Sequence, residues 1–141
     1  MIIVGTGPGV YAVAARTRQF GDKLVLRGFV PNPFNEIGAH VFLHTSRVEG
    51  YGMALIEAGA VGMPIVTTDV GVAREVYGGE VTLARAEDAA TLAESCFALL
   101  TDTDAHRELS AFVQQRAQQH VQPFDQYVHA YTALVQRAAS V

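Results

Sequence analysis

The chain has 141 residues, of which 50% are hydrophobic and 17% charged, and its formal net charge is −4. This length is sufficient to bury a core, and the apolar content is too high for a disordered chain. The ten Lys and Arg residues are scattered and the balance is mildly acidic, which argues against a nucleic-acid-binding surface.

The remaining composition favours a protein of a reducing cytoplasm. No apolar run reaches the ~18 to 20 residues that a membrane span needs. The N-terminal MIIVGTGPG lacks the basic region and cleavage site of a signal peptide. Cys96 is the single cysteine, which excludes an internal disulfide, and its apolar helical surroundings predict a buried thiol.

The N-terminal half alternates apolar runs with turns and helical patterns. Residues 1–4 predict a buried strand that ends in the glycine turn 5–9, and residues 10–20 predict a helix that stops at Gly21. Residues 23–30 predict a second strand. Two prolines restrict residues 31–38 to a turn or a short helix.

The pattern continues through the centre of the chain and then becomes helical. Strands are predicted at residues 40–44, 63–69 and 80–84, separated by a loop at 45–52, a helix at 53–62 and a turn with a short helix at 70–79. Helices are predicted at residues 87–102, 103–121 and 124–139. This order predicts one α/β domain over residues 1–141, with a doubly wound parallel sheet buried on both faces and a helical C-terminal tail packed on its flank.

Ligands of such sheets bind outside the carboxyl ends of the strands. This rule selects the loops at residues 5–9, 28–33, 44–52 and 68–73. Dinucleotide binding at the first loop is disfavoured, because Val10 breaks the G-x-G-x-x-G pattern and Arg27 ends the second strand where an acid is expected. A tight turn or another kind of nucleotide-phosphate loop fits residues 5–9 better.

The loop at residues 45–52 carries the stronger signal. Gly50 and Gly52 allow a ligand to approach the main chain, and the first N–H groups of the following helix form an anion site. Glu49 stands just before these donors. Capping of that helix by Ser46 or Glu49 is an equally good interpretation from the residues alone.

Glu57 lies among apolar helical residues, where a carboxylate is costly unless it reaches water or a partner. By helical geometry, Glu49 and Glu57 are separated by ~12 Å along the axis and only ~80° around it. That separation is too large for a glycosidase pair and suits the two ends of an extended ligand, such as a nucleoside diphosphate sugar.

The stretch HVFLHTSRVEGYGMALIEAGAVGMPIVTTDVG resembles the signature region of retaining, GT-B-fold glycosyltransferases of the family 4 group. MIIVGTGP, LVLRGFVPN and the aromatic positions Phe124, Tyr127 and Tyr131 resemble further parts of the same domain. The resemblance implies the Rossmann-like, donor-binding half of a GT-B fold. It implies transfer of a hexosyl group from a UDP-, GDP- or ADP-sugar to a hydroxyl acceptor.

The resemblance also implies residue roles. Glu49 would be the catalytic residue, contacting donor-sugar hydroxyls near the reacting carbon. Gly50, Tyr51 and Gly52 would present backbone amides to the sugar and phosphate, and Glu57 would bind the ribose hydroxyls.

The other three loops would complete the donor site. Val30 would line the base pocket, with Asn32 as a nearby base contact. The cleft, sugar and phosphate would be bordered by Gly5, Thr6, Gly7, Asp69, Val70 and Gly71. Asp69 alternatively caps the following helix.

Two parts of the family pattern are not found in the sequence: the N-terminal acceptor domain and the first strand–helix unit of the donor domain. We expect the acceptor domain in a longer protein or a separate chain. Arg27 and Arg47 are the basic candidates near the diphosphate, and neither is assigned. His44 is interpreted as a local hydrogen-bonding residue. No residues have metal-ligand spacing, so we expect no metal or other cofactor.

Two alternatives remain. The chain could be a non-catalytic donor-binding or interaction module that needs a separate acceptor-domain partner, or a nucleotide-sugar epimerase of similar architecture. We expect no transmembrane segment, and a membrane-surface association through the absent domain stays open. The sequence does not specify the sugar, base or acceptor.

Overall fold

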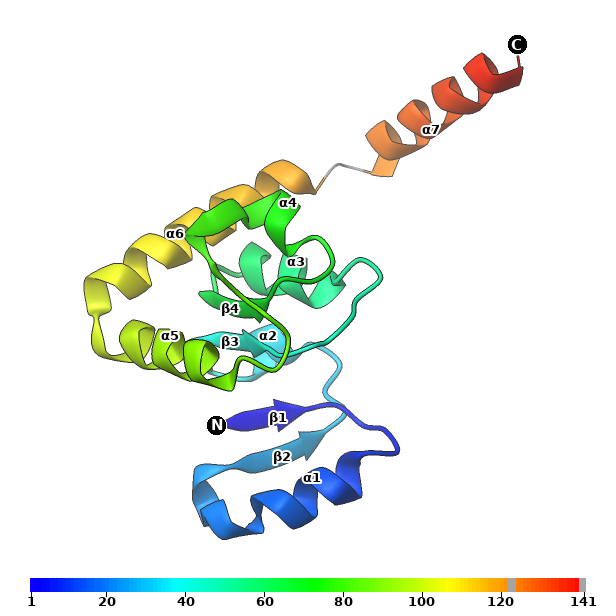
Figure 1. Cartoon of the computed structure of the whole chain (residues 1–141). Coiled ribbons are helices and arrows are strands. Elements are labelled where there is room, and N and C mark those ends of the chain that lie inside the picture. The colour runs from blue at the N-terminus through cyan, green and yellow to red at the C-terminus, as the bar shows by residue number, and fades with distance from the viewer. Residues whose placement is uncertain (122–123, 140–141) are drawn as a thin grey trace.

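The computed structural model describes residues 1–121 and 124–139 (Figure 1). Strands alternate with helices as far as β5, and helices follow, so the predicted α/β class with a helical C-terminal tail is confirmed. The strands are β1 (Ile2–Val4), β2 (Val25–Gly28), β3 (Phe42–His44), β4 (Ile65–Thr68) and β5 (Thr82–Ala84). The helices are α1 (Val10–Thr17), α2 (Pro33–Glu36), α3 (Met53–Ala60), α4 (Ala73–Tyr77), α5 (Ala89–Thr101), α6 (Thr103–His120) and α7 (Phe124–Ala139), with 3₁₀ turns η1 (Arg18–Lys23) and η2 (Gly78–Glu80).

Glycines were predicted to end two of the helices, and the structure confirms this for the second helix only. The first helix changes to the 3₁₀ turn η1 after Thr17, and Gly21 breaks the turn with φ 52° and ψ −135°. Gly62, at φ +72°, reverses the chain after α3. There the Gly62 N–H donates to Gly59 O at 2.8 Å and the Met63 N–H donates to Ala58 O at 2.9 Å, which closes the helix end.

All strand pairs are parallel, but the sheet is in two pieces. One piece is β1–β2 and the other is β3–β4–β5, with β4 in the middle. In Figure 1 the arrowheads of β1, β2 and β3 point to the same side. The prediction of one continuous sheet is wrong, because β1 pairs with β2 and β3 pairs with β4, and no ladder joins β1 to β3.

Burial differs from strand to strand. All four residues of β4 are buried, as predicted for a strand covered on both faces. β1, β2 and β3 instead alternate between exposed and partly exposed residues, so the prediction of two-sided burial fails for these three strands. The main core lies where α3, α4 and α6 meet the three-stranded sheet, and includes Leu55, Ile65, Val76, Tyr77 and Val113.

The helical tail packs only in part as predicted. α5 lies against β4 and β5, and α6 crosses α3 and α4. Asp88 and Asp102 cap these helices, accepting from the Thr91 N–H at 3.1 Å and from the Asp104 and Ala105 N–H groups at 3.0 Å. α7 extends away from the rest of the chain in Figure 1, and its described side chains are exposed, so the packing prediction is wrong for this helix.

Two further sequence predictions concern membrane-spanning helices and the burial of Cys96. None of the helices in the described residues is long and apolar enough to cross a membrane. Cys96 is half-buried against the cluster of Val66, Ala84 and Leu92, and burial raises the pKa of its thiol.

Candidate functional site

The site forms where β3 and β4 end side by side. Their parallel register pairs His44 with Thr67, so the loops that follow both strands leave the same sheet edge. The Val72 N–H, just beyond the β4 loop, donates to Tyr51 O at 2.8 Å. The two loops that hold Glu49 and half of the predicted donor-binding residues are therefore in direct contact.

Gly71 makes this contact possible. It has φ +54°, a conformation that favours glycine. A Cβ added here would lie less than 3.0 Å from Tyr51 O and 3.1 Å from the Glu49 Cβ. Any other residue would push the two loops apart at the position of Glu49.

Glu49, the predicted catalytic residue, is held through one carboxylate oxygen. Its Oε1 accepts from the Ser46 hydroxyl at 2.7 Å and lies 3.1 Å from His44 Nε2. Among the described residues, no hydrogen bond ends on Oε2, and the side chain is 29% exposed. The Ser46 hydrogen bond, aided by His44 and opposed by desolvation, lowers the pKa of Glu49. The carboxylate is ionised with one oxygen available to a ligand.

His44 forms local hydrogen bonds, as predicted, although the sequence did not identify its partners. Its Nδ1 lies 3.2 Å from the hydroxyl of Thr67, a fully buried residue. The Thr68 hydroxyl donates to Ser46 O at 2.6 Å and anchors the same loop to β4.

The N-terminus of α3 is uncapped by side chains. Its N-cap is Gly52, at φ 90°, and no side chain hydrogen-bonds there. Ser46 and Glu49 bond to each other instead, so the capping alternative for them is wrong. The Leu55 N–H donates to Gly52 O at 2.9 Å, so the N–H groups of Met53 and Ala54 are the ones that keep their capacity for an anionic ligand.

Glu57 is exposed, whereas Leu55, Ile56, Ala58 and Gly59 of the same helix are buried. The Glu57 carboxylate reaches water, so it does not pay the desolvation cost that its apolar neighbours in the sequence suggested. The helical separation from Glu49 also does not apply, because α3 starts at Met53 and Glu49 lies in the preceding loop. What remains is two accessible carboxylates, one on the loop and one on the outer face of α3.

Asp69 forms an ion pair that the sequence did not indicate. Its Oδ2 accepts from Arg74 Nε at 3.1 Å and from Nη2 of the same side chain. These contacts raise the pKa of Arg74. The N-cap of α4 is Val72 and receives no side-chain hydrogen bond, so the capping alternative for Asp69 is wrong as well. Arg74 is the basic residue of this edge that sequence reasoning missed.

The two remaining loops pair with each other. The Gly5 N–H donates to Gly28 O at 2.7 Å, which joins the ends of β1 and β2. Thr6, Gly7 and Asn32 are exposed, and Val30 is half-buried. Among the described residues, no hydrogen bond links these loops to those around Glu49, so hydrogen bonding divides the predicted loop residues into two groups.

The basic candidates do not converge on the site. Arg27 is exposed, and Arg47 Nη2 forms an exposed ion pair with Glu87 Oε1 at 2.5 Å. Among the described residues no group of three or more His, Cys, Asp or Glu side chains could hold a metal ion. Metal independence stays a prediction.

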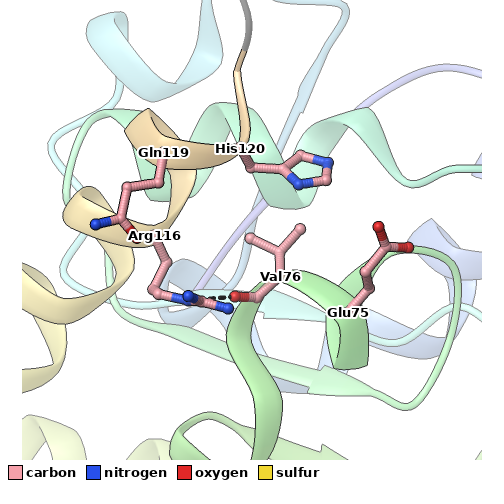
Figure 2. A pocket seen from close by; sticks show the side chains of 5 residues that line it. All are labelled: Glu75, Val76, Arg116, Gln119 and His120. Carbon is pink, nitrogen blue, oxygen red and sulfur yellow. Dashed lines mark hydrogen bonds between the residues drawn. The ribbon is translucent and has the colours of Figure 1, made fainter.

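A small hollow lies next to the site, between α4 and α6 (Figure 2). It is lined by Glu75, Val76, Arg116, Gln119 and His120, and Arg116 Nε donates to Val76 O at 2.7 Å. Its volume of about 110 Å³ is well below that of ligand pockets, which measure roughly 300–1,000 Å³. His120 also bonds the Tyr51 hydroxyl at 2.5 Å, so the Tyr51 side chain is directed to α6.

Comparison with known proteins gives a consistent result. The sequence model of a family described as "Glycosyl transferases group 1" matches residues 1–102. No curated protein matches the chain.

Similar solved structures share the fold. Sucrose-phosphate synthase from Thermosynechococcus elongatus superposes with a TM-score of 0.83 at 21% identity, covering 99% of this chain and 39% of that protein. Anabaena Alr3699/HepE in complex with UDP-glucose superposes with a TM-score of 0.79 at 21% identity, covering 99% of this chain and 40% of that protein. A TarM variant from S. aureus in complex with fondaparinux, alpha-GlcNAc-glycerol and UDP superposes with a TM-score of 0.77 at 19% identity, covering 86% of this chain and 26% of that protein. The chain thus spans between 26% and 40% of the length of these proteins.

Proposed function

Since the chain belongs to the glycosyl transferases group 1 family, we propose that it is the nucleotide-sugar-binding half of a retaining glycosyltransferase. The reaction is transfer of a hexosyl group from a UDP-, GDP- or ADP-sugar to a hydroxyl acceptor. An N-terminal acceptor domain, in a longer protein or a separate chain, supplies the other wall of the cleft. We place this activity in the cytoplasm and expect it to need no metal.

The proposal is carried by the open oxygen of Glu49. Oε2 has no hydrogen-bond partner among the described residues, while Oε1 is fixed by Ser46 and His44. An ionised carboxylate fixed in this way accepts hydrogen bonds from sugar hydroxyls. The close contact of Gly71 with the Glu49 loop sets its place at the sheet edge where ligands of α/β folds bind.

The leaving diphosphate would meet backbone donors. The uncapped first turn of α3 lies just after Glu49, and the helix dipole favours negative charge there. Donors that are fixed before the reaction stabilise charge as it develops on the leaving phosphate. Glu57, exposed on α3, is the proposed acceptor for the ribose hydroxyls.

Calorimetric titration with UDP-, GDP- and ADP-sugars tests the assignment. We expect one of them to bind the chain, weakly because one wall of the cleft is absent. Glu57→Ala should weaken that affinity about tenfold, the effect of losing one or two hydrogen bonds to a charged group. Glu94→Ala, which removes an exposed glutamate of α5, is the matched control and should bind as the unaltered chain does. The assignment fails if no nucleotide sugar binds below millimolar concentration, or if both variants bind alike.

A second candidate is a non-catalytic donor-binding module with a separately encoded partner. The break in the sheet favours it, because β1 and β3 each keep one strand edge without a ladder partner. Co-purification with a second chain that restores transfer activity would identify this arrangement. A monomer whose donor binding and activity do not change on adding an acceptor domain would count against it.

A further inference from the structure

The imidazole of His44 spans the distance between the buried sheet and the Glu49 carboxylate. Nδ1 lies 3.2 Å from Thr67 Oγ1, and Nε2 lies 3.1 Å from Glu49 Oε1. The His44 side chain is only 11% exposed, and Thr67 is fully buried on the neighbouring strand. The ring is therefore anchored at one end in the core and touches the candidate catalytic residue at the other.

The hydrogen-bonding capacity of the partners determines where the ring carries a proton. An ionised carboxylate only accepts, so the contact with Glu49 requires a proton on Nε2. The Thr67 hydroxyl donates to Thr68 O at 2.8 Å, so its oxygen is left to accept from a protonated Nδ1. Where Nδ1 carries no proton, the same hydroxyl can turn from Thr68 O and donate to Nδ1, so the contact with Glu49 needs only the proton on Nε2.

The Glu49 carboxylate is restrained through one oxygen, Oε1, only. Ser46 and His44 both bond Oε1, and the Thr68 hydroxyl fixes the main chain of Ser46. Rotation of the carboxylate would break two hydrogen bonds, one of them to an anchored ring. Among the described residues, Oε2 is left without a hydrogen-bond partner.

We propose that His44 is a positioning residue, which orients Glu49 so that Oε2 meets the hydroxyls of the donor sugar. The role rests on the proposed donor binding and adds to it a residue that acts through Glu49. Glu49 is the ionisable side chain in contact with the ring. The other groups in contact with the ring, Thr67, Ser46 and the Phe42 ring, carry no charge.

A ligand-free measurement tests the contact itself. A proton NMR spectrum should show a downfield imidazole Nε2–H resonance, protected from solvent exchange, that is assigned by its loss in His44→Asn. The resonance should disappear in Glu49→Ala and persist in His129→Asn, which alters an exposed histidine of α7. No protected resonance, or one that survives in Glu49→Ala, overturns the proposal.

Titration with UDP-, GDP- and ADP-sugars and with the free nucleotides tests the consequence. His44→Asn keeps a polar group opposite Thr67 but is too short for Glu49, so the affinity for the nucleotide sugar should fall about tenfold, as for one charge-assisted hydrogen bond. The affinity for the free nucleotide should not change, because Glu49 faces the sugar. His44→Gln, whose amide can reach the place of Nε2, should recover most of the loss.

The outcomes separate the two proposals. Equal losses for nucleotide and nucleotide sugar in His44→Asn would mean a general structural role, and no loss for either would mean that Glu49 is positioned without His44. Each result overturns the positioning role and leaves donor binding intact. If the unaltered chain binds neither ligand, donor binding itself is refuted, and the positioning role falls with it.

Discussion

Tyr51 and Gly71 bring together the two loops that carry most of the candidate site. The Val72 N–H donates to Tyr51 O at 2.8 Å, and a Cβ on Gly71 would lie less than 3.0 Å from that same oxygen. The neighbour is backbone, which cannot move aside as a flexible side chain can. The geometry of Glu49 therefore depends on the absence of a side chain at Gly71.

Gly71→Ala should destabilise the protein. The new methyl group meets Tyr51 O, and φ +54° is itself unfavourable for alanine, so we expect a loss of about 2–4 kcal/mol in the free energy of unfolding. Urea denaturation followed by circular dichroism measures it. Gly79→Ala is the control, since a Cβ there meets nothing within 4 Å, and it should stay within about 0.5 kcal/mol. Similar curves for both variants would refute the role of Gly71.

The sequence predicted the order of the strands and helices because local periodicity records which residues face a core. The helix end at Gly62 was foreseen, since glycine adopts positive φ at little cost. The first helix instead ends at Thr17, before the predicted stop at Gly21, and continues as a 3₁₀ turn. The break between β1–β2 and β3–β4–β5 was not foreseen, because a strand's own residues do not specify which strand pairs with its second edge.

The site was predictable at the level of loops. Parallel strands deliver their carboxyl ends to one edge, so the loops after β3 and β4 could be expected to meet. The exposure of Glu57 was misjudged, because apolar neighbours in sequence cover only part of a short helix. Asp69 bonds Arg74 five residues further on, and His44 bonds Thr67 on the paired strand and Glu49 in its own loop. These partners depend on strand register and loop conformation, which no spacing in the sequence records.

Gly59 and Tyr77 should be energetically coupled. A Cβ on Gly59 would lie less than 3.0 Å from the Tyr77 hydroxyl, which donates to Leu55 O at 2.7 Å inside the core. Gly59→Ala should cost about 2–3 kcal/mol, and clearly less when Tyr77→Phe has removed the hydroxyl. A double-mutant cycle from urea denaturation measures the difference. Additive effects of the two substitutions would contradict the clash.

Tyr77 should also make the fold sensitive to alkali. Burial raises its pKa from 10.0 to about 12. The folded protein holds this proton more tightly than the unfolded chain, so the stabilisation is present below about pH 10 and is lost as the pH rises towards about 12. The difference in unfolding free energy between the unaltered chain and Tyr77→Phe should therefore change over this range. A constant difference would show that Tyr77 does not titrate there.

Ser46 should be the main cause of the low pKa of Glu49. Its hydroxyl is the largest of the contributions that lower this pKa below the ordinary 4.5, and desolvation opposes it. A carboxyl with a lowered pKa stabilises the fold above its unfolded-state value, and this stabilisation is lost as the pH falls through the folded-state pKa. Ser46→Ala should therefore raise the pKa of Glu49 and reduce the loss of stability in acid.

Carbon-13 NMR titration of the Glu49 carboxyl measures this shift directly. Ser95→Ala is the matched control, because it removes a hydroxyl that bonds Thr91 O on α5, far along the chain from the site. If the pKa of Glu49 were the same in Ser46→Ala as in this control, His44 alone would hold the carboxylate. In that case His44→Asn, and not Ser46→Ala, would raise the pKa, so titration of both variants assigns the hydrogen bond that keeps Glu49 ionised.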